Sequence, residues 1–148
     1  GIPMYNGYMT SAKISATTSK HKAIESELIA GFTKCSNRSS TWTIQGAPGY
    51  YPSHQCSYVM SDLNRWVNQI QYHFQWQHSE NPYFTGFHKS NSVSRSGCRA
   101  DGTPEYDGGK DQLGKTCLTL KGNIVGVTSN IGDESGNSKY LVSTIFVE

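Results

Sequence analysis

The fold is decided by residues 1–32, GIPMYNGYMTSAKISATTSKHKAIESELIAGF, the one long segment near a terminus with a helix-like composition. Apolar side chains recur in it at steps of three and four residues, which places them on one face of a helix. They are Tyr5, Tyr8, Met9, Ala12, Ala16, Ala23, Ile24 and Leu28. A polar stretch, 17–22, interrupts this face, and Gly31 is a suitable helix stop. We therefore expect a helix over 1–32, against which the rest of the chain folds.

The composition sets limits on the class of protein. A chain of 148 residues suffices for one domain with one hydrophobic core, so we expect a single domain over 1–148. A net charge of +2 is too small for the dense basic face of an obligate nucleic-acid binder. The aromatic content of 11% argues against disorder of the whole chain. The sequence contains no run of about 18 apolar residues that could span a membrane.

A second helix is predicted over 59–80, after a connecting loop over 33–58 that holds one short strand-like run at 41–44. Ser61 or Asp62 can cap this helix, and Asn81-Pro82 ends it, because a residue before proline avoids helical geometry. Its apolar stripe has helical spacing. The stripe consists of Met60, Leu63, Trp66, Val67, Ile70 and Phe74.

The remaining segment, 81–148, is predicted to hold loops followed by an antiparallel sheet. Its three β-like runs, 116–121, 123–130 and 139–148, are rich in Val, Ile, Thr and Leu. Gly122 separates the first two as a tight hairpin. The expected fold is α+β: a long N-terminal helix packed against an antiparallel sheet of three or four strands, with Trp66, Ile70 and Phe74 of the second helix also on the sheet.

Four cysteines, Cys35, Cys56, Cys98 and Cys117, lie at wide spacings, without the C-x-x-C of zinc or thioredoxin sites. An even number in a small chain rich in Tyr, Ser and Asn favours two disulfides in an oxidising compartment over four buried thiols. Three pairings are possible. We favour Cys35–Cys56 and Cys98–Cys117, since each closes a single glycine-containing loop, worth about 3 kcal/mol in the chain-entropy model.

The sequence has few signs of a metal site. His21, His54, His73, His78 and His88 are scattered, and no H-E-x-x-H motif is present. An acidic loop offers oxygen ligands suited to calcium, although Tyr106 and Gln112 replace the glycine and the glutamate that an EF-hand requires. Its candidate ligands are Asp101, Glu105, Asp107 and Asp111. We expect a solvated turn here and no metal site, with a calcium site as the weaker alternative.

No enzyme signature is present. The chain has no G-x-S-x-G, no P-loop and no G-x-G-x-x-G, and both disulfides together leave no cysteine as a nucleophile. We expect neither catalysis nor a cofactor. Positive charge along the first helix could meet a DNA backbone or be a solvated or subunit-facing surface. It comes from Lys13, Lys20, His21, Lys22, Lys34 and Arg38.

The opening residues resemble type IV pilins. In that family a run of the form I-P-x-Y-x-x-Y-x-x-x-A/S follows the apolar half of the spine helix. Here the matching residues are Ile2, Pro3, Tyr5, Tyr8 and Ala12. The order of helix, loop, antiparallel sheet and disulfide-delimited region is also similar. The resemblance covers about 30 residues at the level of motif and the remainder at the level of architecture.

The resemblance implies a subunit of a bacterial surface filament that acts by self-assembly. The implied partners are copies of the chain or related pilins, the pilus assembly machinery, and the inner membrane through an apolar half-helix absent from this sequence. The implied packing residues on the helix are Ile2, Tyr5, Tyr8, Met9, Ala12 and Ala16. The polar stretch 17–22 would then mark the change from subunit-facing to head-facing surface. The implied location is an extracellular pilus.

Three alternatives remain open at this stage. The chain could be a minor or competence-type pilin that binds DNA, or a pseudopilin of a type II secretion system. From a different class, it could be a small secreted disulfide-bonded binding module with no role in filaments.

Overall fold

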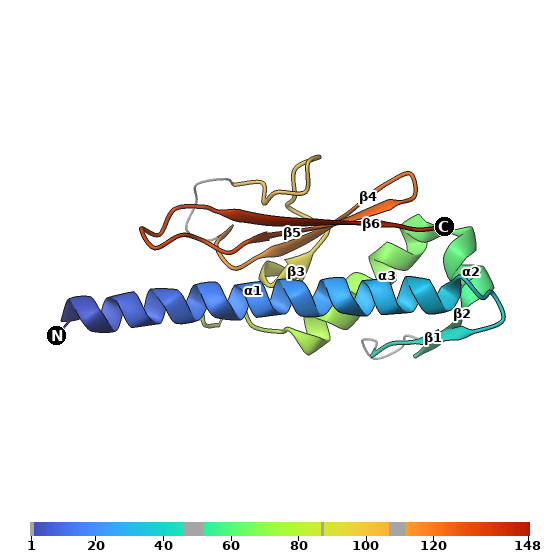
Figure 1. Cartoon of the computed structure of the whole chain (residues 1–148), viewed down its shortest axis with the longest axis horizontal. Helices are drawn as coiled ribbons and strands as arrows, with labels where there is room; N and C mark the ends of the chain where they lie inside the picture. The colour runs from blue at the N-terminus through green and yellow to red at the C-terminus, as the bar shows by residue number, and fades with distance from the viewer. Residues whose placement is uncertain (1, 46–51, 87, 107–111) are drawn as a thin grey trace.

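One helix, α1 (Ile2–Cys35), runs along most of the molecule in the computed structural model (Figure 1). The structure describes residues 2–45, 52–86, 88–106 and 112–148, and only the backbone of residues 2–6. Pro3 lies in the first turn of α1, where the missing N–H has no partner within the helix. The helix continues past Gly31, the predicted stop, to Cys35, so this boundary was wrong.

Gly31 is a packing residue instead. A Cβ atom there would lie 2.0 Å from Cζ2 of Trp42, so only glycine admits the indole against α1. Trp42 lies in β1 (Thr41–Thr43), which pairs antiparallel with β2 (Ser53–Gln55). Its ring contacts Phe32 edge-on, with the ring centroids 5.0 Å apart. The glycine therefore joins α1 closely to the first strand rather than ending the helix.

The predicted second helix is two helices, α2 (Cys56–Ser61) and α3 (Leu63–Gln77). The predicted connecting loop therefore contains β1, β2 and the start of α2. Asp62 breaks the helix with non-helical backbone angles, φ −146° and ψ 83°. Its Oδ1 accepts the N–H of Arg65 at 3.1 Å and so caps α3, one of the two caps predicted. α3 ends at Gln77, before the predicted Asn81-Pro82 boundary.

The main sheet has the strand order β3-β4-β5-β6. β4 (Thr116–Lys121), β5 (Ile124–Asn130) and β6 (Tyr140–Phe146) pair antiparallel, as predicted. β3 (Val93–Ser94), which follows a short 3-10 turn, η1 (Lys89–Asn91), pairs parallel with β4. The fourth strand therefore makes the sheet mixed, which corrects the expectation of a wholly antiparallel sheet.

Local chemistry fixes both turns of the antiparallel meander. Gly122 has φ 62° in the two-residue loop between β4 and β5, a conformation that favours glycine. Between β5 and β6, Oδ1 of Asp133 accepts the N–H groups of Ser135 and Asn137 at 2.9 and 2.8 Å. The second turn is thus closed by its own aspartate.

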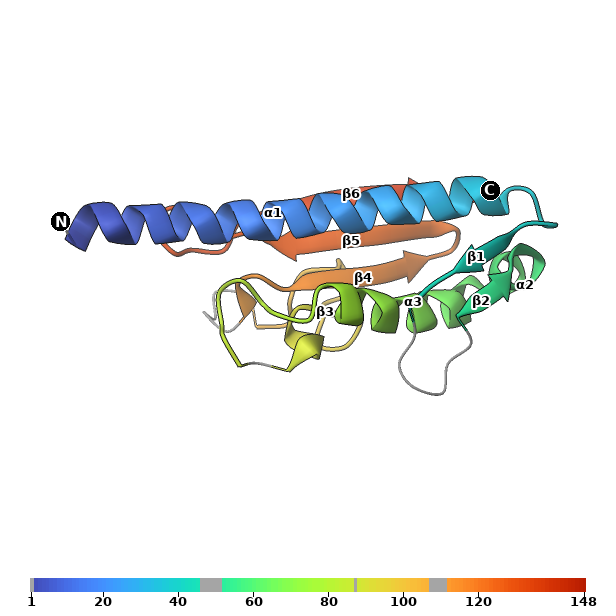
Figure 2. The ribbon, with the colours of Figure 1, turned by 90° about the horizontal axis from the view of Figure 1, so that it is seen from below.

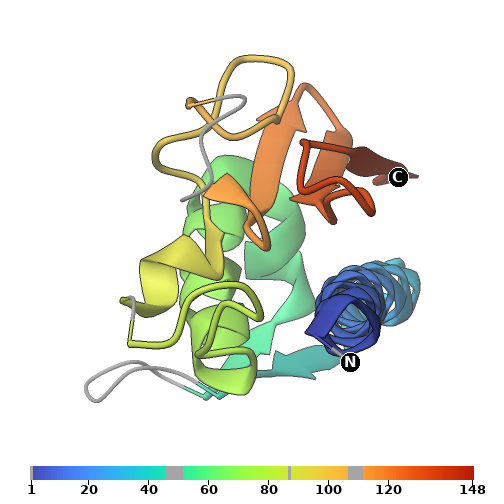
Figure 3. The same ribbon diagram turned by 90° about the vertical axis from the view of Figure 1, so that its left-hand side faces the viewer.

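Both long helices pack on the same face of the main sheet. α1 lies against β5 and β6, and α3 lies against β3 and β4 (Figures 2 and 3). Trp66, Ile70 and Phe74 are fully buried, which confirms their predicted place in the core. The inward sheet residues that complete this cluster are Leu118, Val125, Val127 and Ile145. Burial of such side chains contributes about 1.5–3 kcal/mol each.

Two disulfides, with the pairing favoured from the sequence, tie the elements together. Cys35–Cys56 joins the end of α1 to the start of α2. Cys98–Cys117 joins the loop after β3 to β4. Disulfides of this kind persist in oxidising environments, so the structure indicates a periplasmic or extracellular location.

Candidate assembly surface

The helix α1 has two distinct long faces. Every third or fourth residue from Thr17 onward is buried against the head, the part of the chain after α1. This buried stripe consists of Thr17, Lys20, His21, Ile24, Leu28, Gly31, Phe32 and Cys35. The sequence had placed Ile24 and Leu28 on the same face as Tyr8 and Ala12. That assignment was wrong, because the helix turns them toward the head.

The polar stretch 17–22 lies inside the contact between α1 and the head. Thr17 and His21 are fully buried, and Lys20 is nearly so. The Lys20 ammonium donates to the backbone oxygens of Ser92, at 2.7 Å, and Gly114, at 2.5 Å. Burial lowers the pKa of Lys20 to about 7. The stretch therefore marks the point where α1 begins to pack against the head, as predicted; that the surface before it faces other subunits stays a prediction.

His21 takes part in a hydrogen-bond chain with one consistent direction. The hydroxyl of Ser143 donates to Oε2 of Glu25, so Ser143 Oγ accepts from Nε2–H of His21 at 2.8 Å. When the imidazole is neutral, its other ring nitrogen, Nδ1, accepts the hydroxyl hydrogen of Ser129, and Ser129 Oγ accepts that of Thr116. This arrangement needs a neutral imidazole, and burial lowers the pKa of His21 in agreement with it. The chain binds the middle of α1 to β5 and β6.

The second face of α1 lies in solvent. Tyr8 is 72% exposed and Met9 37% exposed, and Ala12 and Ala16 are also exposed. Of the packing residues implied by the pilin resemblance, these four lie together on the solvent side. The side chains of Ile2 and Tyr5 lie outside the described residues. The exposed face continues along the helix through Ser19, Ala23, Ser26 and Ala30, all small residues.

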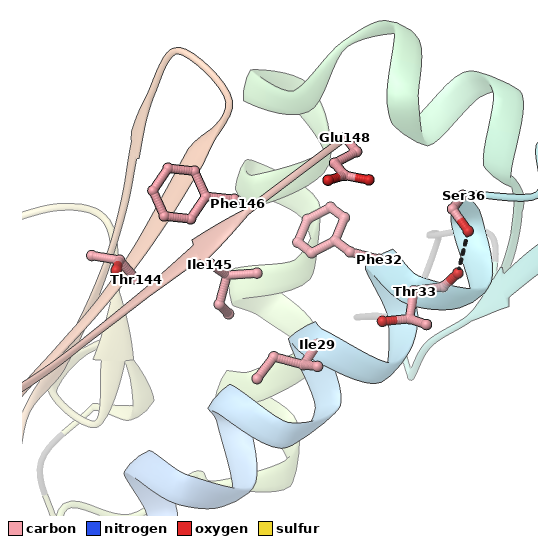
Figure 4. A pocket seen from close by; sticks show the side chains of 8 residues that line it. All are labelled: Ile29, Phe32, Thr33, Ser36, Thr144, Ile145, Phe146 and Glu148. Atoms are coloured by element: carbon pink, nitrogen blue, oxygen red, sulfur yellow. Dashed lines mark hydrogen bonds between the residues drawn. The ribbon is translucent and has the colours of Figure 1, made fainter.

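A groove of about 400 Å³ borders this face, between the end of α1 and β6 (Figure 4). Ile29, 45% exposed, and Phe32 line it from the helix, and Phe146, 68% exposed, lines it from the strand. This groove was not among the sites predicted from the sequence. Its signal is the alternation of apolar residues at both faces of the last strand, Val142 and Phe146 on one and Ile145 on the other.

The predicted basic stripe is not one surface. Lys20 and His21 are buried, so they cannot meet a DNA backbone in this fold. Lys13 lies over the ring of Tyr83, with Nζ 5.7 Å from the centroid. Lys22, Lys34 and Arg38 are exposed but follow no common helical phase. The physical reason is that the head occupies the side of α1 from which the central charges project.

The histidines and acidic residues form no metal centre within the described part of the chain, where no three His, Cys, Asp or Glu side chains gather suitably. Oδ1 of Asp101 accepts both the N–H and the hydroxyl of Thr103, and these bonds lower the pKa of Asp101. Glu105 is exposed. Asp107 and Asp111, the other two candidate calcium ligands, lie outside the described residues. The solvated turn favoured from the sequence therefore stays a prediction, and so does its calcium-binding alternative.

His73 is buried and has a defined tautomer. Its Nδ1 accepts the backbone N–H of Gln45 at 2.8 Å, so Nε2 carries the hydrogen that it donates to Glu27. This pair holds α3 against α1 and against the residue after β1. His73 therefore connects α1, α3 and Gln45, and none of its described partners is a nucleophile.

Comparisons with known proteins identify no relative: no family model, no curated protein and no solved structure matches the chain. Within the described residues, no helix combines the length and the apolar content needed to cross a bilayer. The structure itself shows an α+β fold with an N-terminal helix, strands and two disulfides.

Proposed function

We propose that the chain is a structural subunit of a type IV pilus-like filament on a bacterial surface, and that it acts by self-assembly rather than by catalysis. The observation that carries the proposal is the division of α1 into a buried stripe and an opposite exposed stripe of small and apolar residues. Small side chains let two helices approach closely, and burial of Tyr8 and Met9 between copies supplies a hydrophobic driving force.

The geometry of α1 also favours an open filament over a closed dimer. At about 1.5 Å per residue, its 34 residues span about 50 Å. Among the described residues before Thr17, none is fully buried, and the first turns of the helix project beyond the head (Figure 1). The groove beside Ile29 lies near the opposite end. Two different surfaces on one subunit form head-to-tail contacts, which propagate when they do not close into a ring.

The experiment is deletion of the gene in the organism that makes the protein, followed by electron microscopy of surface filaments. The wild-type gene should restore filaments, whereas Ala16→Glu should not, because it places a charge in the centre of the exposed face. Ser57→Glu, at an exposed position on α2, is the matched control and should restore them. Filaments that persist unchanged in the deletion strain would refute the proposal.

A further inference from the structure

The main sheet has an open edge at the second half of β4. β3 has only two residues, and its last pair joins Ser94 to Cys117. The chain then leaves β4, because the N–H of Arg95 is donated to Oε1 of Gln71 on α3, at 3.0 Å. Nothing in the described chain pairs with β4 on this side from that point onward.

The register identifies which backbone groups lie at this edge. Thr116 donates its N–H to Ser92 on the β3 side, so the alternate residues Leu118 and Leu120 face the same side. Beyond the last β3 pair, this leaves the carbonyl of Leu118 and both the N–H and the carbonyl of Leu120. Within the described chain, no strand pairs with these three groups, and unpaired strand edges of this kind bind extended peptides.

The same edge is the floor of a groove of about 430 Å³ with a positive lining. Arg95, Arg99 and Lys121 line it, together with Cys98, Ala100 and the residues 118–120 of β4. None of the described residues that line it is an aspartate or glutamate, and Asp101 lies near Arg99, whose charge helps to lower the pKa of Asp101. The loop that Cys98 fixes to Cys117 forms one wall, so the width of the groove is held by a covalent bond.

Arg95 remains a net charge in the groove because its partners are neutral. Its guanidinium donates to the carbonyl and side-chain oxygens of Asn64, at 3.1 and 3.2 Å, and to Oδ1 of Asn68 at 2.9 Å. Partial burial of the guanidinium lowers the pKa of Arg95, since the cation loses solvent without gaining an anion. A carboxylate that enters the groove would supply the missing counter-charge.

We propose that this groove binds an extended acidic peptide segment, which adds a strand beside β4 and places carboxylates near Arg95 and Lys121. A nucleic-acid phosphate fits less well, because the carbonyls of Leu118 and Leu120 need hydrogen-bond donors that a phosphodiester lacks. A peptide backbone supplies donors and an acceptor together. The proposal does not depend on filament formation.

The test is fluorescence polarisation with a labelled probe of five Thr-Asp repeats, whose alternation places every carboxylate on one side of a strand. The wild-type protein should bind this peptide. A Thr-Lys probe, and a Thr-Asp probe with N-methylated Asp residues that cannot donate backbone hydrogen bonds, should each bind at least about tenfold more weakly. Equal binding of the N-methylated probe would overturn strand addition.

Two variants test the location. Lys121→Glu, at an exposed position, should weaken binding of the Thr-Asp probe about tenfold, whereas Lys139→Glu, exposed just before β6, should change it less than about twofold. Hydrogen exchange at the N–H of Leu120 should slow when the probe binds. Absence of binding by wild type, equal effects of the two variants, unchanged exchange at Leu120, or full displacement by inorganic phosphate would each overturn the proposal.

Discussion

Lys20 is the residue whose role differs most from its sequence pattern. A lysine within a polar stretch of a helix indicates a solvated position, yet this ammonium is buried and bound by neutral oxygens. Since the folded protein shields it from water without an anionic partner among these contacts, its charged form is disfavoured and its pKa falls from 10.5 to about 7. The stability of the fold should therefore depend on pH through this side chain.

Between pH 7 and pH 10 the unfolded chain keeps the Lys20 proton that the folded chain loses. More protons are then bound by the unfolded state, so the free energy of unfolding rises with pH, by up to about 1.4 kcal/mol per unit. Lys20→Met should lack this rise, when urea denaturation is measured at several pH values from 7 to 9. Lys22→Met, at an exposed position, should keep the wild-type slope. Identical slopes in wild type and Lys20→Met would contradict the buried cation.

Gly31 and Gly7 form a natural pair on α1. Gly31→Ala places a Cβ 2.0 Å from the ring of Trp42, and we expect a loss of about 1–3 kcal/mol in the free energy of unfolding. Gly7→Ala meets nothing within 4 Å and should be neutral or stabilising by up to about 1 kcal/mol. Thermal denaturation of both variants checks this, and equal shifts would mean that Trp42 does not pack on the helix.

The sequence could not show that Lys20 is buried or that Gly31 packs against Trp42, because residue composition and helical periodicity describe one helix without its neighbours. Gly31 has the same local preference whether it ends a helix or admits an indole from a strand that starts ten residues later. Thr17, Lys20 and His21 broke the apolar period although they occupy buried positions. Their partners, Ser92, Gly114, Ser129 and Ser143, lie far along the chain.

At the scale of elements, the sequence correctly predicted those parts of the structure that have a strong local signal. The stripe of Trp66, Ile70 and Phe74 and the hairpin at Gly122 each carry their structure in neighbouring residues. β3 was not predicted because a strand of two residues is too short to show an alternation of apolar and polar side chains. Its pairing with β4 depends on residues far along the chain. The break at Asp62 was seen only as a cap, since a capping aspartate does not reveal that another helix precedes it.

The Cys35–Cys56 bond connects two such elements and should contribute about 3 kcal/mol, as expected for a loop of this length. The double variant Cys35→Ala, Cys56→Ala should lose at least that much in urea denaturation, because both side chains are fully buried. Wild type should fall to similar stability or below when a reductant opens both disulfides. A double variant as stable as oxidised wild type would mean that this bond is absent from the native protein.

At the scale of the whole molecule, the structure shows which of the implied packing residues are exposed, while their role in packing stays a prediction. Tyr8, Met9, Ala12 and Ala16 are exposed together, but the sequence did not separate them from Ile24 and Leu28. Whether a residue of α1 is exposed or buried depends on which side of the helix the head covers, and helical spacing does not predict that side. The groove at Ile29 and Phe146 needs a helix and a strand from opposite ends of the chain. The apolar residues on both faces of the last strand are a local signal for its strand side, but they do not predict that the end of α1 lies beside them.

The central claim is that copies of the chain bury the exposed face of α1 in a filament. The direct measurement is maleimide labelling of Ala16→Cys in sheared surface filaments and in dissociated subunits, with Ser57→Cys as control and mass spectrometry as readout. We predict that the thiol introduced by Ala16→Cys reacts in subunits and is protected in filaments, while the thiol introduced by Ser57→Cys reacts in both. Filaments that contain the chain but leave the Ala16→Cys thiol as reactive as in the subunit would contradict the account.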